Sequence, residues 1–399
     1  MTSLTEDRSP EVEATKARPR LESVDMLRGL VMVIMVLDHV REFFGHININ
    51  PVDLSRTTAP LFFTRWITHV CAPVFVFLAG TGAYLAGSRG RPRSAQARFL
   101  FTRGLWLVFL EFTAVRLGMT FDLTFQFVPL TVIWVIGVSM MILAGLIYLP
   151  TPAIGVLGVA MIAGHNAFDG VKPESWGPFA DVWRLLHQLG PLRFTIAGRT
   201  ILVLYPLIPW IGVMAAGFAF GSLLKIPRVS LRRGVLLSLG LTMTAAFVAL
   251  RWSNLYGDPR PWTSQPRGPE FTILSFLNCQ KYPPSLQFLL MTLGPAIAML
   301  AVFDRGAGRI GRPLVTLGRV PLFFYLLQWY LIHILAIAVD WCTGQPYAWL
   351  LHNGPFNAPE GYGYSLPVVY GMWVATLLLL YPLCRWFSGV KSRRRLGFL

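Results

Sequence analysis

The stretch LRGLVMVIMVLDHVREFFGH, residues 27–46, decides the fold and most of the functional interpretation. It predicts a membrane-spanning helix that is apolar after Arg28 and becomes charged at its far end, at Asp38 and His39. Arg28 and His39 are eleven residues apart, which places them on one helical face about 16 Å from each other. His46 follows seven residues later on nearly the same face. Ionisable groups at membrane depth are costly and usually serve a site or pair internally.

The composition predicts an all-α, polytopic transmembrane helix bundle. Of the 399 residues, 54% are hydrophobic and 14% are charged, whereas a soluble protein has roughly 25% charged residues. A spanning helix needs about 20 apolar residues, and ten stretches qualify or nearly do. The predicted spans are 24–45, 67–87, 104–117, 129–148, 152–167, 201–224, 235–251, 285–303, 320–340 and 367–386.

The distribution of charge predicts the topology and excludes nucleic acid as a partner. The net charge is +16, but most of the Lys and Arg residues lie in short loops between the apolar spans, as the positive-inside rule requires of cytoplasmic loops. We therefore expect both termini to be cytoplasmic, the protein to lie in the plasma or inner membrane, and membrane lipids to surround it. The longer outer loops contain one helical segment, 181–189, which is expected to lie flat on the surface.

Three segments follow from this organisation. Residues 1–22 are predicted to be a disordered cytoplasmic tail, 23–388 the transmembrane domain, and 389–399 a basic cytoplasmic tail. The four cysteines show no CxxC spacing, which argues against a metal or redox framework. Nothing in the composition fixes the oligomeric state.

The candidate catalytic residues lie in the first three predicted spans. Asp38 stands beside His39, and a carboxylate can hold an imidazole in one tautomer and raise its basicity, as a general base requires. His69 lies at the outer end of the second span, where it could approach His39. Glu111 lies inside the third span, where a carboxylate needs a partner such as a histidine or Arg116. Each histidine could instead be structural, and no third metal ligand stands at convincing spacing, so no metal is expected.

Candidate substrate-binding residues lie on either side of this group. Arg28 and the other inner arginines could hold donor phosphates, although topology and anionic lipids also explain inner arginines. Lys281 precedes the eighth span and is either an interface anchor or a substrate contact. In the ninth span, His333 lies on a helical stripe with Tyr325 and Trp329, near Gln328. His46 completes the substrate-binding candidates.

Six segments resemble the heparan-α-glucosaminide N-acetyltransferase-like family of bacterial integral membrane proteins. They are SVDMLRGLVMVIMVLDHVREFF (23–44), WITHVCAPVFVFLAGTGAYL (66–85), RGLWLVFLE (103–111), YPLIPWIGVMAAGFAFG (205–221), KYPPSLQFLLMTLGPA (281–296) and GRVPLFFYLLQWYLIHILA (318–336). Their order along most of the chain makes the resemblance specific. The Arg28–x10–His39 spacing is also similar to a signature of membrane acyltransferases that modify sugars.

The resemblance implies transfer of an acyl group, acetyl in the first instance, from cytoplasmic acyl-CoA to an extracytoplasmic sugar or glycolipid. It implies acetyl-CoA or another acyl-CoA as the donor substrate and a histidine at the centre, with His39 in the matching position and His69 left open as the leading residue. Two other functions stay open from the residues alone. One is a proton-coupled transporter or lipid flippase whose buried His, Asp and Glu relay protons, and the other is a membrane sensor without turnover.

Overall fold

The structure is a computed structural model that describes residues 21–46, 48–124, 127–192 and 199–394. Most of the predicted N-terminal tail, residues 1–20, lies outside the described residues, and α1 already begins at Glu22. The predicted C-terminal tail starts as helix, because α16 continues from Leu366 to Arg394. Residues 395–399 of that tail are outside the described part of the chain.

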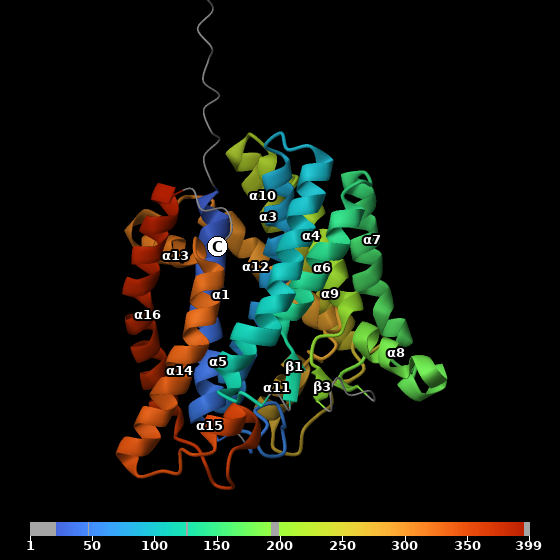
Figure 1. The fold of residues 1–399 in the computed structure, drawn as a ribbon. Coiled ribbons are helices and arrows are strands. Elements are labelled where there is room, and N and C mark those ends of the chain that lie inside the picture. The colour runs from blue at the N-terminus through green and yellow to red at the C-terminus, as the bar shows by residue number, and fades with distance from the viewer. Residues whose placement is uncertain (1–20, 47, 125–126, 193–198, 395–399) are drawn as a thin grey trace, which may run out of the picture.

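The described chain forms a helix bundle with short helical turns between its long members (Figure 1). The longer helices are α1 Glu22–Phe44, α3 Cys71–Gly87, α4 Arg93–Leu110, α6 Val132–Leu146, α7 Thr151–Gly164, α9 Leu207–Phe220, α10 Val229–Ser253, α12 Leu286–Phe303, α13 Gly308–Gly318, α14 Pro321–Thr343 and α16 Leu366–Arg394. The short helices are α2 Ala59–Trp66, α5 Arg116–Thr120, α8 Ala180–His187, α11 Pro269–Leu277 and α15 Leu350–Asn353. The 3-10 turns are η1 Ile67–Val70, η3 His165–Phe168, η4 Pro173–Phe179, η5 Leu223–Lys225 and η6 Gly354–Asn357, and η2 Glu111–Val115 is a π-helical turn.

The two ends of the bundle differ in what they hold. Figure 1 shows that α1 begins and α16 finishes at the same end, which we call the basic end because Arg28, Arg103, Arg319 and Lys391 surround a cavity there. The opposite end, which we call the loop end, holds α8, α11, α15 and the strands (Figure 1). The helix predicted at 181–189 is confirmed as α8, although it finishes at His187, and its position on the outer surface stays a prediction.

Helix α1 is the central element. It packs against α3, α12, α13, α14 and α16, and its buried residues lie on every side of the helix, from Val24 to Phe44. A helix that is apolar all round needs neighbours all round, and the sequence of α1 meets that condition between Arg28 and Asp38. The candidate residues on α1 are therefore walled in by protein along most of the helix.

Pairs of small residues let the helices approach closely. Gly104 of α4 and Gly137 of α6 face each other, and a Cβ on either one would come within 2.5 or 2.7 Å of the other's carbonyl oxygen. In lipid there is little hydrophobic force between helices, so close van der Waals contact at small residues stabilises the pair. These crossings fix the positions of the helices that line the cavity.

A small sheet at the loop end corrects two predicted span boundaries. Strands β1 Phe127–Leu130 and β3 Thr200–Val203 are parallel, and β2 Gly190–Pro191 pairs antiparallel with β3. The spans predicted to start at residues 129 and 201 therefore start too early, because these residues bury one side of a sheet and not a helix face. Helix α9 begins only after Pro206, which cannot continue a strand and is its N-cap.

Seven helical stretches of the described chain are long and apolar enough to cross a membrane. They coincide with seven of the ten predicted spans. The other three predictions, 24–45, 104–117 and 129–148, also fall on helices, but α1 and α4 carry more charge and α6 is short. The chain is thus mostly helical and multi-pass, while the count of ten spans and the cytoplasmic side of the termini stay predictions.

Candidate active site

A cavity of about 350 Å³ lies inside the bundle at the basic end. Its charged lining consists of Arg28 from α1, Arg103 from α4, Arg319 after α13 and Lys391 from α16. Its walls are apolar side chains of α3, α4, α6 and α14, which include Leu78, Leu107, Ile136, Met140 and Leu322. A ligand that fits this cavity carries negative charge at one end and an apolar or amphipathic extension at the other.

Arg28 is held in place at this cavity by contacts with its own helix, α1, and with α13. Its guanidinium group donates to Asp25 Oδ1 and to the carbonyl oxygen of Gly318, both at 3.1 Å. Lys391 Nζ donates to the carbonyl oxygen of Arg319 at 3.3 Å. Arg28 and Lys391 are therefore positioned by backbone and carboxylate contacts at the cavity, and the binding role of Arg28 stays a prediction.

Tyr325 links the cavity to His39. The tyrosine lines the cavity, and its ring meets the imidazole of His39 edge-on with 6.3 Å between centroids. One turn further along α14, Trp329 stacks on His39 at 3.9 Å with 25° between the ring planes. Because α14 presents these rings at i and i+4, the aromatic stripe seen in the sequence is the surface that holds His39.

Several buried polar atoms around His39 have no hydrogen-bond partner in the described residues. They are His39 Nδ1, His69 Nδ1, Trp329 Nε1 and both amide atoms of Gln328. Gln328 lies beside His39, although the two side chains do not reach full hydrogen-bond geometry. A buried unpaired polar group costs about 1–3 kcal/mol, so these atoms gain from an incoming polar substrate.

A group of charges lies next to the two imidazoles. Asp38 accepts from Arg41 at 3.1 Å and forms an ion pair with Arg65. The charges of Asp38, Arg65 and Lys281 act on both His39 and His69. Elements far apart in sequence, α1, η1 with its preceding helix α2, and the segment before α12, thus bring four of the predicted residues together.

Asp38 does not form the hydrogen bond with His39 that their adjacent positions suggested. Its carboxylate bonds to the guanidinium groups of Arg41 and Arg65, since successive side chains on a helix diverge by about 100°. Its negative charge still acts on His39. Asp38 therefore anchors two arginines, and an orienting effect on His39 would be electrostatic.

Glu111 pairs with neither a histidine nor Arg116. Its carboxylate accepts from the backbone N–H groups of Thr131 at 2.9 Å and Trp134 at 3.1 Å, which caps the first turn of α6. Arg116 pairs instead with Asp122 at 2.6 Å. Glu111 also begins the π-helical turn η2, and such turns are frequent at functional sites.

Two predicted substrate residues have surroundings that differ from those of His39. His46 follows the end of α1 and is exposed. His333 is buried, its ring nitrogens lie 3.0 Å from the Gly118 carbonyl oxygen and 2.8 Å from that of Leu350, and its ring stacks on Phe121 at 3.8 Å. These contacts explain His333 as a packing residue of the loop end, and its binding role stays a prediction.

Sequence reasoning gave no role to Arg65, Arg319 or Lys391. Arg319 and Lys391 lie next to apolar helices, where basic residues are expected for topology alone. The signal that could have found them is their number at one end of the bundle, since only the fold gathers them around one cavity. Arg65 stands four residues before His69 on a helix, which was a usable sign of a shared face.

A comparison with protein families matches residues 20–252 to the model described as heparan-alpha-glucosaminide N-acetyltransferase, catalytic. The match covers more than half of the chain, and it includes α1, η1 and the cavity walls from α3, α4 and α6. No curated protein matches the chain.

Proposed function

The chain belongs to the heparan-alpha-glucosaminide N-acetyltransferase catalytic family, and from this premise we propose a specific reaction for it. The protein transfers an acyl group, most simply acetyl, from acyl-CoA bound at the basic end to an amino or hydroxyl group of a sugar or glycolipid at the loop end. With the basic end cytoplasmic, as the positive-inside rule favours, the acceptor is extracytoplasmic, in the plasma or inner membrane.

The observation that carries this proposal is the cavity between the four cations and Tyr325. Acyl-CoA has phosphate groups at one end and a long, weakly polar arm that carries the thioester at the other. Arg28, Arg103, Arg319 and Lys391 suit the phosphates, and the apolar walls suit the arm. The rise of α1 between Arg28 and His39 is about 16 Å, so an extended arm held at Arg28 points its thioester toward the imidazole.

His39 is the group that we place at the reacting atoms. The acceptor nitrogen or oxygen attacks the thioester carbonyl carbon, the carbon–sulfur bond breaks, and CoA leaves as a thiolate that takes up a proton. His39 removes the proton of the acceptor as a general base, or it first carries the acyl group itself. Stacking on Trp329 fixes the ring plane, which keeps a ring nitrogen aimed at the substrate.

The neighbouring side chains have supporting roles. Lys281 and Arg65 place positive charge beside His39, where it can stabilise the oxyanion of the tetrahedral intermediate. His69 and Gln328 offer unpartnered polar atoms to the acceptor. Tyr325 stands between the cavity and His39, so the thioester has to pass its ring. Glu111 holds the first turn of α6, which also lines the cavity.

The test is an acyl-transfer assay with the full chain in detergent or lipid nanodiscs. Acetyl-CoA and glucosamine are supplied as probes, and acetylated sugar and free CoA are measured by mass spectrometry. Cell-envelope glycans from cells with and without the protein are compared in parallel, which reveals acceptors other than glucosamine. We expect acetyl groups to appear on an acceptor in a His39-dependent manner. Proton-dependent uptake without any acyl transfer would overturn the proposal in favour of a transporter.

A further inference from the structure

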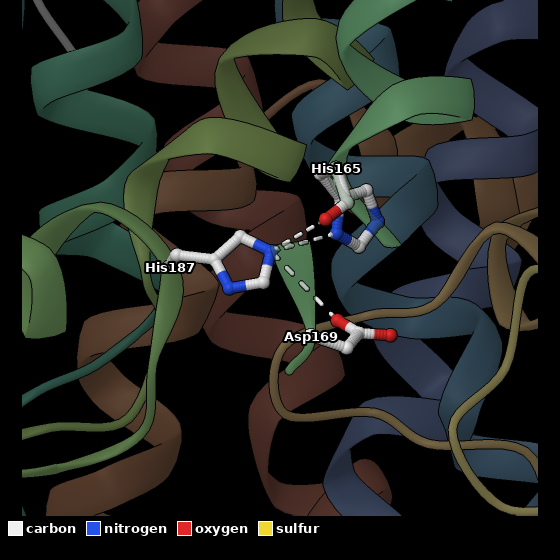
Figure 2. A group of neighbouring side chains, drawn as sticks. All are labelled: His165, Asp169 and His187. Atoms are coloured by element: carbon white, nitrogen blue, oxygen red, sulfur yellow. Dashed lines mark hydrogen bonds and ion pairs between the residues drawn. The ribbon is translucent and has the colours of Figure 1, made fainter. Parts of the chain in front are cut away.

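A second cluster of histidines lies at the loop end, away from the cavity. His165 opens the 3-10 turn that follows α7, Asp169 comes directly after that turn, and His187 is the last residue of α8. Figure 2 shows their side chains converging from these elements. One ligand atom from each residue lies within 4.8 Å of the other two.

The separations between these atoms match those of metal ligands. His165 Nδ1 lies 3.4 Å from His187 Nε2, and His187 Nε2 lies 3.8 Å from Asp169 Oδ1. Imidazole nitrogens and carboxylate oxygens bind zinc at about 2.0–2.2 Å in tetrahedral geometry, which places two ligand atoms about 3.4 Å apart. Without a metal, His187 Nε2 can donate to the His165 carbonyl oxygen at 2.8 Å, so zinc binding at this nitrogen has to release that proton.

Neighbouring side chains hold these three groups in place, as hydrogen-bonded and packed neighbours do for the ligands of known metal sites. Asn166 donates to Asp169 Oδ2 at 2.8 Å, which leaves Oδ1 directed at His187. The ring of Trp183 stacks on His187 at 5.0 Å. His165 Nε2 is buried without a partner in the described chain, although the Pro284 carbonyl lies near it. With the ring proton on Nε2, toward Pro284, the lone pair of His165 Nδ1 faces His187 Nε2 and can bind a metal.

The electrostatics also suit a bound cation. Both histidines are buried, at 2% and 3% exposure, while Asp169 is half-buried and gives access from the surface. Asp169 can therefore supply a negatively charged ligand at a position that an ion reaches from the surface.

We propose that His165, Asp169 and His187 form a zinc site that fastens α8 to the end of α7, with a solvent molecule as the fourth ligand. The site also reaches the proposed active site through the backbone. Asn166 Oδ1 accepts from the N–H of Leu286 at 2.9 Å, at the start of the helix that follows Lys281. Zinc bound here restrains Asn166 and, through its contact with Leu286, the start of α12 after Lys281.

The test measures zinc in the purified full chain, independently of acyl transfer. After purification without chelators, we expect about one zinc per chain by mass spectrometry, and we expect zinc added after EDTA treatment to raise the melting temperature. The variants His187→Asn and Asp169→Asn should lose both effects. Asp169→Asn is the milder change, because it keeps the side-chain size at a half-buried position.

His352→Ala is the matched control, because His352 is an exposed histidine of α15 at the same end. It should retain zinc and the melting shift. Cobalt in place of zinc should give the visible absorption of a tetrahedral site in the wild type and not in His187→Asn. Zinc content equal in wild type and Asp169→Asn, or a folded wild type without zinc affinity, would overturn the proposal without bearing on the acyltransferase assignment.

Discussion

His39 and His333 lie in two adjoining regions of the same helix interface and show how differently a histidine inside the bundle can be used. His333 has a carbonyl oxygen within hydrogen-bond distance of each ring nitrogen and a phenyl ring stacked on it. His39 has a stacked ring as well, but its buried Nδ1 has no partner among the described residues. Phe43 and Trp329 separate the two imidazoles. The contrast separates a satisfied packing residue from one that is available for chemistry.

Whether the fold satisfies the ring nitrogens distinguishes these two histidines better than their residue type or their position does. Both histidines lie on or beside the same aromatic stripe, with His333 buried and His39 half-buried. A polar group that the fold satisfies has its hydrogen-bonding capacity used up, whereas one left unsatisfied costs free energy that only a ligand recovers. The following predictions test whether this distinction holds.

The largest expected effect is that of His39→Ala on acyl transfer. Loss of a general base typically costs about 10²–10⁴-fold in rate, so kcat should fall by that factor while binding of acyl-CoA and the melting temperature change little. The assay is acetyl transfer from acetyl-CoA by the full chain, with His352→Ala as the control. Transfer at near wild-type rate in the variant would contradict the assignment of His39.

His333→Ala should show the opposite pattern. A neutral imidazole donates through only one of its ring nitrogens, so the variant leaves one buried carbonyl group without its donor. Such a loss costs about 1–3 kcal/mol, and the free energy of unfolding should fall by roughly that amount. Thermal unfolding in detergent measures this loss. The activity per folded molecule should stay close to that of the wild type. A stable variant with a low kcat would instead move His333 into the active site.

The same distinction explains what the sequence could predict. The spacing of Arg28 and His39 and the apolar run between them were enough to predict the central helix and the shared face. The period of 181–189 was enough to predict α8. These features are local, and local periodicity follows directly from helix geometry.

The remainder depended on contacts between distant segments. Glu111 caps α6 through backbone groups some twenty residues away, and Asp38 pairs with Arg65 of another helix. His165 and His187 meet across a loop at the loop end. A single sequence contains no signal for such pairings, so partners assigned from neighbouring positions, such as His39 for Asp38, differ from those that the fold provides.

At the basic end, Arg28→Gln and Lys391→Gln should weaken the binding of the acyl-CoA donor. A hydrogen bond to a charged group is worth about 1.5–3 kcal/mol, so each change should raise the KM for acetyl-CoA by roughly 10- to 150-fold and leave kcat less affected. Arg309→Gln is the control, because Arg309 is exposed on α13 and does not line the cavity. An unchanged KM in both variants, with intact folding, would contradict the proposal that the CoA phosphates bind in this cavity.

The smallest expected effect belongs to Glu111→Gln and decides between its two roles. The carboxylate accepts two backbone hydrogen bonds at the first turn of α6, whereas an amide offers one acceptor oxygen and no charge for the helix terminus. The free energy of unfolding should fall by about 1–2 kcal/mol, measured by thermal unfolding against Glu270→Gln, an exposed glutamate in the first turn of α11. Because Val132 and Ile133 of that turn only line the cavity beside Tyr325, kcat should fall only a few-fold. A loss of rate as large as that of His39→Ala, with unchanged stability, would show that Glu111 takes part in proton transfer and that its contacts to α6 are secondary.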